Sequence, residues 1–146
     1  MDFRFTAEDE AFRSEVGSFL DAELPYGWQG VQGPEDFDFE LEMRKKLAGR
    51  GWFAMAWPKE YGGGGAGIVQ QMIYNEEIGY RRAPGRDGQG VGMIGPCIIV
   101  HGTDGQKKEH LSRTASADVV WCQGYSEPGA GSDLAGLQTR AVRDGD

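Results

Sequence analysis

The 146-residue sequence has no long hydrophobic run, few basic residues and only two cysteines. No stretch approaches the roughly 18 apolar residues of a membrane-spanning helix, so we expect no membrane span. Fifteen Lys and Arg against 23 Asp and Glu give a net charge of −8, which argues against nucleic acid and anionic membrane surfaces as partners. Cys97 and Cys122 match neither a CxxC pair nor the spacing of a metal site. They predict two buried, reduced thiols in a cytoplasmic protein, and no bound metal.

Glycine, by contrast, is abundant. The 24 glycines are about twice the usual share of roughly 7%, and they cluster at 62–67, 85–95 and 124–136. Gly62-x-Gly64-x-x-Gly67 matches a dinucleotide-binding pattern by letter. That pattern requires a preceding β-strand, whereas Trp57 to Tyr61 is charged and contains a proline. A turn before a helix is therefore the better interpretation.

Two capping signals predict helix starts in the first 117 residues. Thr6 with Asp9 is a variant of the capping box, and Thr103 with Gln106 is a full one. The first precedes apolar residues at helical spacing and a helix that ends before Pro25.

Three further helices are expected from charge order and apolar spacing. Asp38 could cap a helix that stops at Gly51, and another helix spans about 67–80. The segment 88–102 predicts a helix with a break near Pro96. Residues 1–117 are therefore predicted to form a helical bundle domain, so the fold is mainly α.

The sequence period changes after Asp118. Residues 119–125 alternate bulky and small side chains as a strand does, and 137–143 predicts a second strand. We therefore expect residues 118–146 to hold the first strands of a truncated β-barrel-like domain. Asp144-Gly145 is a hairpin signal that no later strand follows, so we expect the chain to be the front part of a larger protein.

A small-residue loop separates these two strands. Gly129, Ala130, Gly131 and Ser132 leave backbone N–H groups uncovered, so an anionic ligand could approach closely. A polar turn between strands is the structural alternative. Glu127 is interpreted as a carboxylate that fixes the loop.

The run WCQGYSEPGAGSDL at 121–134 closely resembles the flavin-binding signature of the acyl-CoA dehydrogenases. Further segments of the sequence agree with the family in order, at 57–63, 76–79, 95–96 and 101–107. The resemblance covers essentially the full chain. It implies an N-terminal helical domain, a middle β domain and, in the family's longer chains, a C-terminal four-helix domain. FAD in the family lies between domains and between subunits.

The resemblance implies five cofactor-binding residues. Tyr125 and Ser126 match positions that contact the flavin ring, and Gln123 lies at a neighbouring contact position. The family commonly has a smaller aliphatic residue where Tyr125 stands. Ser132 matches the serine that meets the FAD pyrophosphate, and Gly131 allows that approach.

The substrate contacts implied by the resemblance are fewer. Ser132 could instead meet the CoA portion of the substrate. Met93 and Ile94 fall on the helix that lines the acyl pocket in relatives.

The implied activity is FAD-dependent α,β-dehydrogenation of an acyl-CoA thioester. The family's catalytic base is a glutamate of the C-terminal domain, so we expect no catalytic residue among these 146 and no activity of this chain alone. The Gln-Gly-Tyr-Ser form of the motif resembles bacterial members, some acting on bulky or steroid-derived CoA esters. Implied partners are acyl-CoA, an electron-transfer flavoprotein and further subunits in a homo- or hetero-oligomer. A non-catalytic truncated or partner subunit, and a same-fold flavin oxidase or monooxygenase, remain alternatives.

Overall fold

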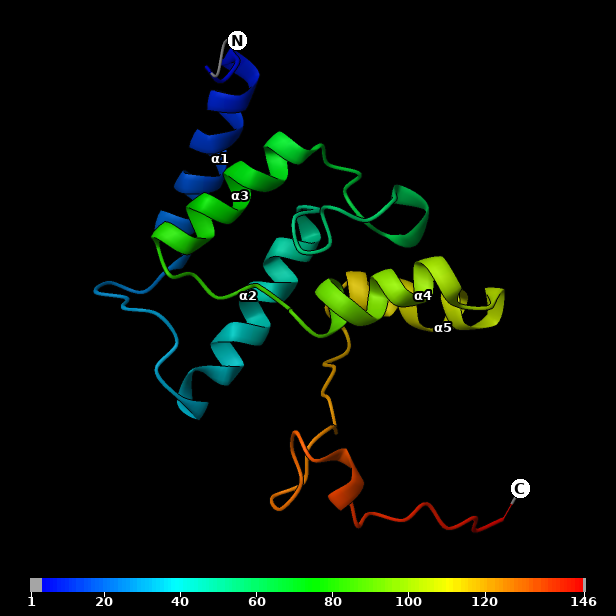
Figure 1. The fold of residues 1–146 in the computed structure, drawn as a ribbon. Helices are drawn as coiled ribbons and strands as arrows, with labels where there is room; N and C mark the ends of the chain where they lie inside the picture. The colour runs from blue at the N-terminus through cyan, green and yellow to red at the C-terminus, as the bar shows by residue number, and fades with distance from the viewer. Residues whose placement is uncertain (1–3, 146) are drawn as a thin grey trace.

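The computed structural model describes residues 4–145, and its regular structure is helical (Figure 1). The five α-helices of this part of the chain are α1 (Ala7–Glu23), α2 (Phe37–Gly49), α3 (Ile68–Tyr80), α4 (Gly95–His101) and α5 (Asp104–Ala115). A π-helix, Gly90–Ile94, runs directly into α4, and single 3₁₀ turns lie at Pro34–Asp36, Lys59–Tyr61 and Leu134–Gly136. None of the helices within 4–145 is long and apolar enough to cross a membrane.

Both predicted capping boxes are confirmed. The Thr6 hydroxyl accepts the Asp9 N–H at 3.1 Å, and the Asp9 carboxylate accepts the Thr6 N–H at 2.9 Å. At α5 the Gln106 side chain accepts the Thr103 N–H at 2.9 Å, and the Thr103 hydroxyl accepts the Gln106 N–H at 3.3 Å. Each box satisfies two backbone donors that a helix start otherwise leaves without partners.

Two details of the helix predictions are wrong. Asp38 lies inside the first turn of α2, because a 3₁₀ turn at Pro34–Asp36 already leads into the helix at Phe37. Pro96 does not break its segment; it lies in the first turn of α4, directly after the π-helix. The helical path from Gly90 to His101 is therefore continuous.

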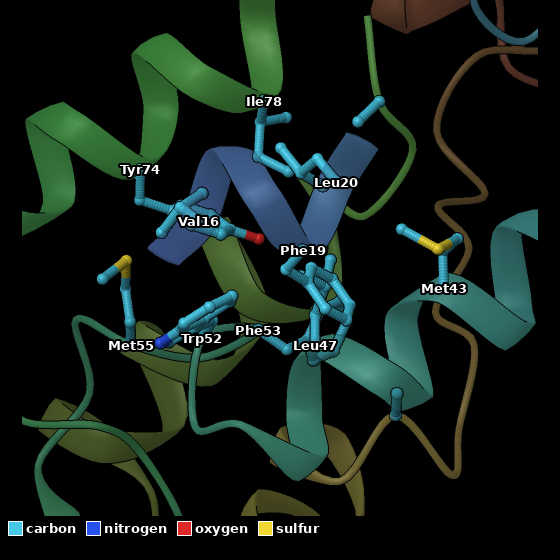
Figure 2. Packing of buried hydrophobic residues seen from close by; sticks show 12 residues of the cluster. Val16, Phe19, Leu20, Met43, Leu47, Trp52, Phe53, Met55, Tyr74 and Ile78 are labelled. Carbon is cyan, nitrogen blue, oxygen red and sulfur yellow. The ribbon is translucent and has the colours of Figure 1, made fainter. Parts of the chain in front are cut away.

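The main core lies among α1, α2 and α3 (Figure 2). Trp52 is central to it, meeting the rings of Phe12 and Phe19 edge to face at 5.9 and 5.6 Å. Such pairs stabilise beyond the apolar area they bury. The helices supply the aliphatic part of this core through Val16, Leu20, Met43, Leu47 and Ile78. A smaller cluster around Trp57 and Leu111 joins α5 to the rest.

Ion pairs reinforce the contact of α1 with α3. Glu77 of α3 binds Arg13 of α1 at 2.9 Å and also pairs with Arg81. Arg81 in turn binds Asp21 of α1 at 2.6 Å. Because the Glu77 side chain is only 13% exposed, removing one partner costs more here than in an ordinary surface salt bridge, since it leaves a poorly solvated charge.

The predicted strands at 119–125 and 137–143 are not formed in the described residues. An extended segment becomes a strand only when a partner accepts its backbone hydrogen bonds, and residues 4–145 contain no β-ladder, only one isolated bridge between Glu127 and Ala130. Figure 1 shows this C-terminal segment leading away from the helices. The helical part of the fold prediction is thus confirmed, and the β domain stays a prediction.

The expected burial of both cysteines is also wrong. Cys97 on α4 and Cys122 in the extended segment are exposed, and neither is in a disulfide. On α4 the neighbouring Ile98 and Ile99, not Cys97, pack against the core, and residues 119–126 lie largely on the surface.

Candidate flavin-facing loop

A tight turn organises the loop that the sequence singles out. Glu127 and Ala130 exchange two backbone hydrogen bonds, of 3.0 and 3.1 Å, around the pair Pro128-Gly129. Gly129 does not adopt a positive φ, so the turn does not depend on glycine, and proline suits its first central position. Ala130 is buried, whereas its neighbours on both sides are exposed.

The Glu127 carboxylate closes the loop. It accepts the backbone N–H of Gln138 at 2.9 Å and that of Thr139 at 2.7 Å. Hydrogen bonding from Thr139, and then from the Gln138 amide, holds the pKa of Glu127 below its usual range. The predicted role of Glu127 in fixing the loop is confirmed.

Trp121 anchors the segment that leads into the loop. Its Nε1 donates to the Thr114 hydroxyl of α5 at 3.0 Å, and its ring meets His110 edge to face at 5.7 Å. It also packs against Gly90, where a Cβ would come within 2.6 Å of the indole. The sequence pattern placed Trp121 only on the bulky face of a strand, and sequence reasoning missed this anchoring role.

All five predicted cofactor residues are exposed. Ser126 and Gly131 flank the bridged pair, so the turn brings them to the same end of the loop, with Ser132 next to them. Gln123 and Tyr125 lie in the extended segment before the turn, and the Tyr125 ring is 76% exposed.

Exposed backbone donors make the loop fit an anionic ligand. Nothing lies within 4 Å of the Cβ position of Gly129 or Gly131, and neither has a positive φ. The fold of residues 4–145 therefore does not require glycine at either position. In that part of the chain the amides of Gly129, Gly131 and Ser132 donate to no other group. Amides without an internal partner can donate to an anionic ligand.

Two of the three predicted substrate contacts lie on a separate element, whereas Ser132 lies in the loop. Met93 and Ile94 end the π-helix, with Met93 47% exposed and Ile94 half-buried. Trp57 positions this helix by donating from Nε1 to the Val91 carbonyl at 3.0 Å. Figure 1 shows the loop apart from the π-helix and α4, and no hydrogen bond within residues 4–145 joins the two regions.

The sequence profile of the family described as acyl-CoA dehydrogenase, N-terminal domain, matches residues 6–118. The chain belongs to the acyl-CoA dehydrogenase family. The resemblance found in the sequence is thereby confirmed. The profile match ends before the loop, so the loop's relationship to the family depends on longer alignments.

Individual acyl-CoA dehydrogenases align through the loop as well. The acyl-CoA dehydrogenase FadE26 of Mycobacterium tuberculosis is 39% identical, over 100% of this chain and 38% of its own length. The probable acyl-CoA dehydrogenase YngJ of Bacillus subtilis is 31% identical over the same shares. This chain thus spans about 38% of the length of these acyl-CoA dehydrogenases.

Two solved assemblies are similar in structure. The ChsE4–ChsE5 complex of Mycobacterium tuberculosis matches with a TM-score of 0.76 and 36% identity, over 100% of this chain and 37% of the compared chain. The Tcur3481–Tcur3483 steroid acyl-CoA dehydrogenase matches with a TM-score of 0.75 and 40% identity, over 100% and 38%. Both comparisons place the arrangement of helices described above within the acyl-CoA dehydrogenase fold.

Proposed function

We propose that this chain supplies the helical part and one flavin-facing loop of an FAD-dependent acyl-CoA dehydrogenase. The reaction removes hydrogen from the α and β carbons of an acyl-CoA thioester. The observation that carries the proposal is the closed loop at 127–139, which presents exposed glycine amides in a chain of this family.

The loop residues bind and orient the cofactor. The amides of Gly131 and Ser132, with the Ser132 hydroxyl, hold the pyrophosphate. Ser126, with Gln123 and Tyr125 before it, contacts the ring system. FAD supplies, when bound, the acceptor for the hydride that leaves the β carbon.

The acidic residue of the loop is not suited to be the catalytic base. The Glu127 carboxylate is the nearest candidate by sequence, but it accepts two backbone N–H groups and its pKa is lowered. A lowered pKa weakens a base. Proton abstraction is therefore assigned to a carboxylate outside this chain segment, and we expect the 146 residues alone to be inactive.

The proposed substrate is a bulky acyl-CoA, and the proposed assembly is a hetero-oligomer. One similar structure is named a steroid acyl-CoA dehydrogenase, and another is a complex of two named chains. Met93, exposed at the end of the π-helix, supplies an adaptable apolar contact for the acyl group, aided by Ile94. An electron-transfer flavoprotein is the proposed electron acceptor.

Amide-resolved NMR of the 146-residue chain during FAD titration tests the cofactor site. We expect weak binding that is not retained through purification, with shifts concentrated at the amides of Gly129, Gly131 and Ser132. Gly131→Ala adds a methyl group into the approach path without a clash and should weaken binding several-fold. Gly49→Ala, at an exposed position with equal free space, is the matched control. Shifts centred outside the loop, no shifts at all, or equal binding by both variants would refute the assignment.

A non-catalytic partner subunit is the second candidate function. Both similar structures are named as pairs of chains, which favours this candidate. Flavin absorbance during the reaction with acyl-CoA distinguishes the two candidate functions. An assembly containing this chain should lose its oxidised-flavin absorbance when acyl-CoA is added, and Ser126→Ala in this chain should slow that loss only if this loop faces the reacting flavin.

A further inference from the structure

One side chain ties the segment that leads to the flavin-facing loop to the helices. Trp121 is half-buried, and its Nε1 donates to the Thr114 hydroxyl of α5 at 3.0 Å. Within residues 4–145 no other hydrogen bond joins the segment 119–139 to the α-helices. The position of this segment relative to the helices therefore depends largely on the indole of Trp121.

Thr114 and His110 hold the indole from α5. Thr114 is buried, and its hydroxyl donates to the His110 carbonyl at 2.8 Å. Because that bond uses the proton of the hydroxyl, the oxygen is left to accept from Trp121. The His110 ring meets the indole edge to face at 5.7 Å. Two residues one turn apart on α5 thus fix both the polar and the aromatic part of Trp121.

The indole also contacts the first residue of the π-helix. A Cβ on Gly90 would lie 2.6 Å from Cδ1 of Trp121, so the missing side chain lets the ring approach the backbone. Gly90 is itself fixed, because its N–H donates to the Asp87 carboxylate at 2.9 Å. The next carbonyl, of Val91, accepts from Trp57. Trp121 therefore packs on a part of the π-helix that is held by hydrogen bonds of its own.

Two elements with different proposed ligands meet at this side chain. Met93, a proposed acyl contact, lies three residues after Gly90 on the π-helix, and Ser126, a proposed flavin contact, lies five residues after Trp121. Reacting atoms must be held about 3–3.5 Å apart, and a misplacement of about 1 Å can cost on the order of 100-fold in rate. A side chain that contacts both elements is placed to set that distance.

We propose that Trp121 is a positioning residue for the dehydrogenation. It fixes the flavin-contacting segment against the acyl-contacting π-helix, so loss of its anchor slows hydride transfer more than it weakens binding of either ligand. This role rests on the proposed function, because Trp121 acts through Ser126 and Met93 and itself exchanges no proton or hydride.

Two substitutions of Thr114 provide a matched test in an assembly containing this chain. Thr114→Val has nearly the same shape but cannot accept from the indole, whereas Thr114→Ser keeps the hydroxyl and loses only a methyl group. We expect Thr114→Val to lower the rate of flavin reduction at saturating acyl-CoA about tenfold, with FAD content and the half-saturating acyl-CoA concentration changed less than about twofold. Thr114→Ser should restore most of the rate. Trp121→Phe removes the indole N–H without changing the buried threonine and should match Thr114→Val.

The exposed cysteines supply a second readout that requires neither FAD nor turnover. Cys97 lies on α4, which continues the π-helix, and Cys122 directly follows Trp121. Spin labels on these two thiols, with any other cysteines of the assembly replaced, report the distance between the two elements by electron paramagnetic resonance. The distribution of distances should be narrow in the wild type and in Thr114→Ser, and broader in Thr114→Val and Trp121→Phe.

Several outcomes would overturn the positioning role of Trp121. An unchanged distance distribution or an unchanged rate in Thr114→Val and Trp121→Phe would do so, as would an equal loss of rate in Thr114→Ser. Loss of FAD or of acyl-CoA affinity large enough to account for the slower rate would show instead that Trp121 serves binding or folding. A wild-type assembly whose flavin is not reduced by acyl-CoA would refute the proposed function, and this role with it, whereas a reduced wild type with unaffected variants would refute this role alone.

Discussion

Gly95→Ala should destabilise the protein even though alanine is the better helix former. Gly95 is the first residue of α4 and has ordinary helical dihedral angles, φ −59° and ψ −52°. Glycine is therefore needed at this position because the surrounding atoms leave no room for a side chain. A Cβ at this position would lie 1.8 Å from Cζ2 and 2.1 Å from Cη2 of Trp57, distances that require one of the two residues to move.

Trp57 has little freedom to move. It is 3% exposed and its Nε1 donates to the Val91 carbonyl. Overpacking a core costs about 1–3 kcal/mol, and loss of that hydrogen bond costs about 1 kcal/mol more. The helical preference of alanine returns roughly 0.5–1 kcal/mol. The expected net loss in the free energy of unfolding is thus about 2 kcal/mol, measured by urea denaturation.

Matched variants make this test decisive. Gly49→Ala lies in α2 with nothing within 4 Å of its Cβ position and should stabilise by up to about 1 kcal/mol. Adding Trp57→Phe removes the two clashing atoms, so the double variant should lose less stability than the two single losses added together. A Gly95→Ala variant as stable as Gly49→Ala would refute the steric argument.

Three further predictions concern charge and capping. Glu77→Gln removes a largely buried partner of two arginines and should cost about 1–3 kcal/mol of unfolding free energy by urea denaturation; no change would show that α1 and α3 do not need the pairs. Thr103→Ala should cost about 1 kcal/mol by the same assay through loss of the α5 cap, and unchanged stability would show that the cap is not needed. Because the pKa of Glu127 is lowered from 4.5, its stabilisation of the loop is present above that value and is lost as pH falls through the lower folded pKa. NMR titration of the two amides it accepts should give a midpoint below 4.5, and none in Glu127→Gln; a midpoint at or above 4.5 would contradict the closed loop.

The helices could be predicted where their signals are local. The boxes at Thr6 and Thr103 involve residues three positions apart, so the sequence contains everything that forms them. Asp38 was misplaced because Asp36 and Pro34 start a 3₁₀ turn first, and Asp36 bonds the Gln32 N–H rather than capping. The sequence pattern alone does not show whether Asp36 or Asp38 lies at the start of the helix.

The predicted features that the described residues do not show depend on partners distant in sequence. The alternation at 119–125 gives side chains suited to the two faces of a β-sheet. A strand also requires a neighbouring strand for its backbone hydrogen bonds, and residues 4–145 provide none. The π-helix likewise has a partner distant in sequence, because Trp57 donates to the Val91 carbonyl. The loop was found from sequence because its small residues and Glu127 follow one another closely in the chain.

The closure of the loop has a thermodynamic consequence. Every hydrogen bond that shapes it joins residues within 127–139. Fixing the backbone of one residue costs roughly 1–2 kcal/mol in conformational entropy, and here that cost falls on folding. A ligand that meets the loop finds its donors already ordered, so the entropy of arranging them does not subtract from affinity.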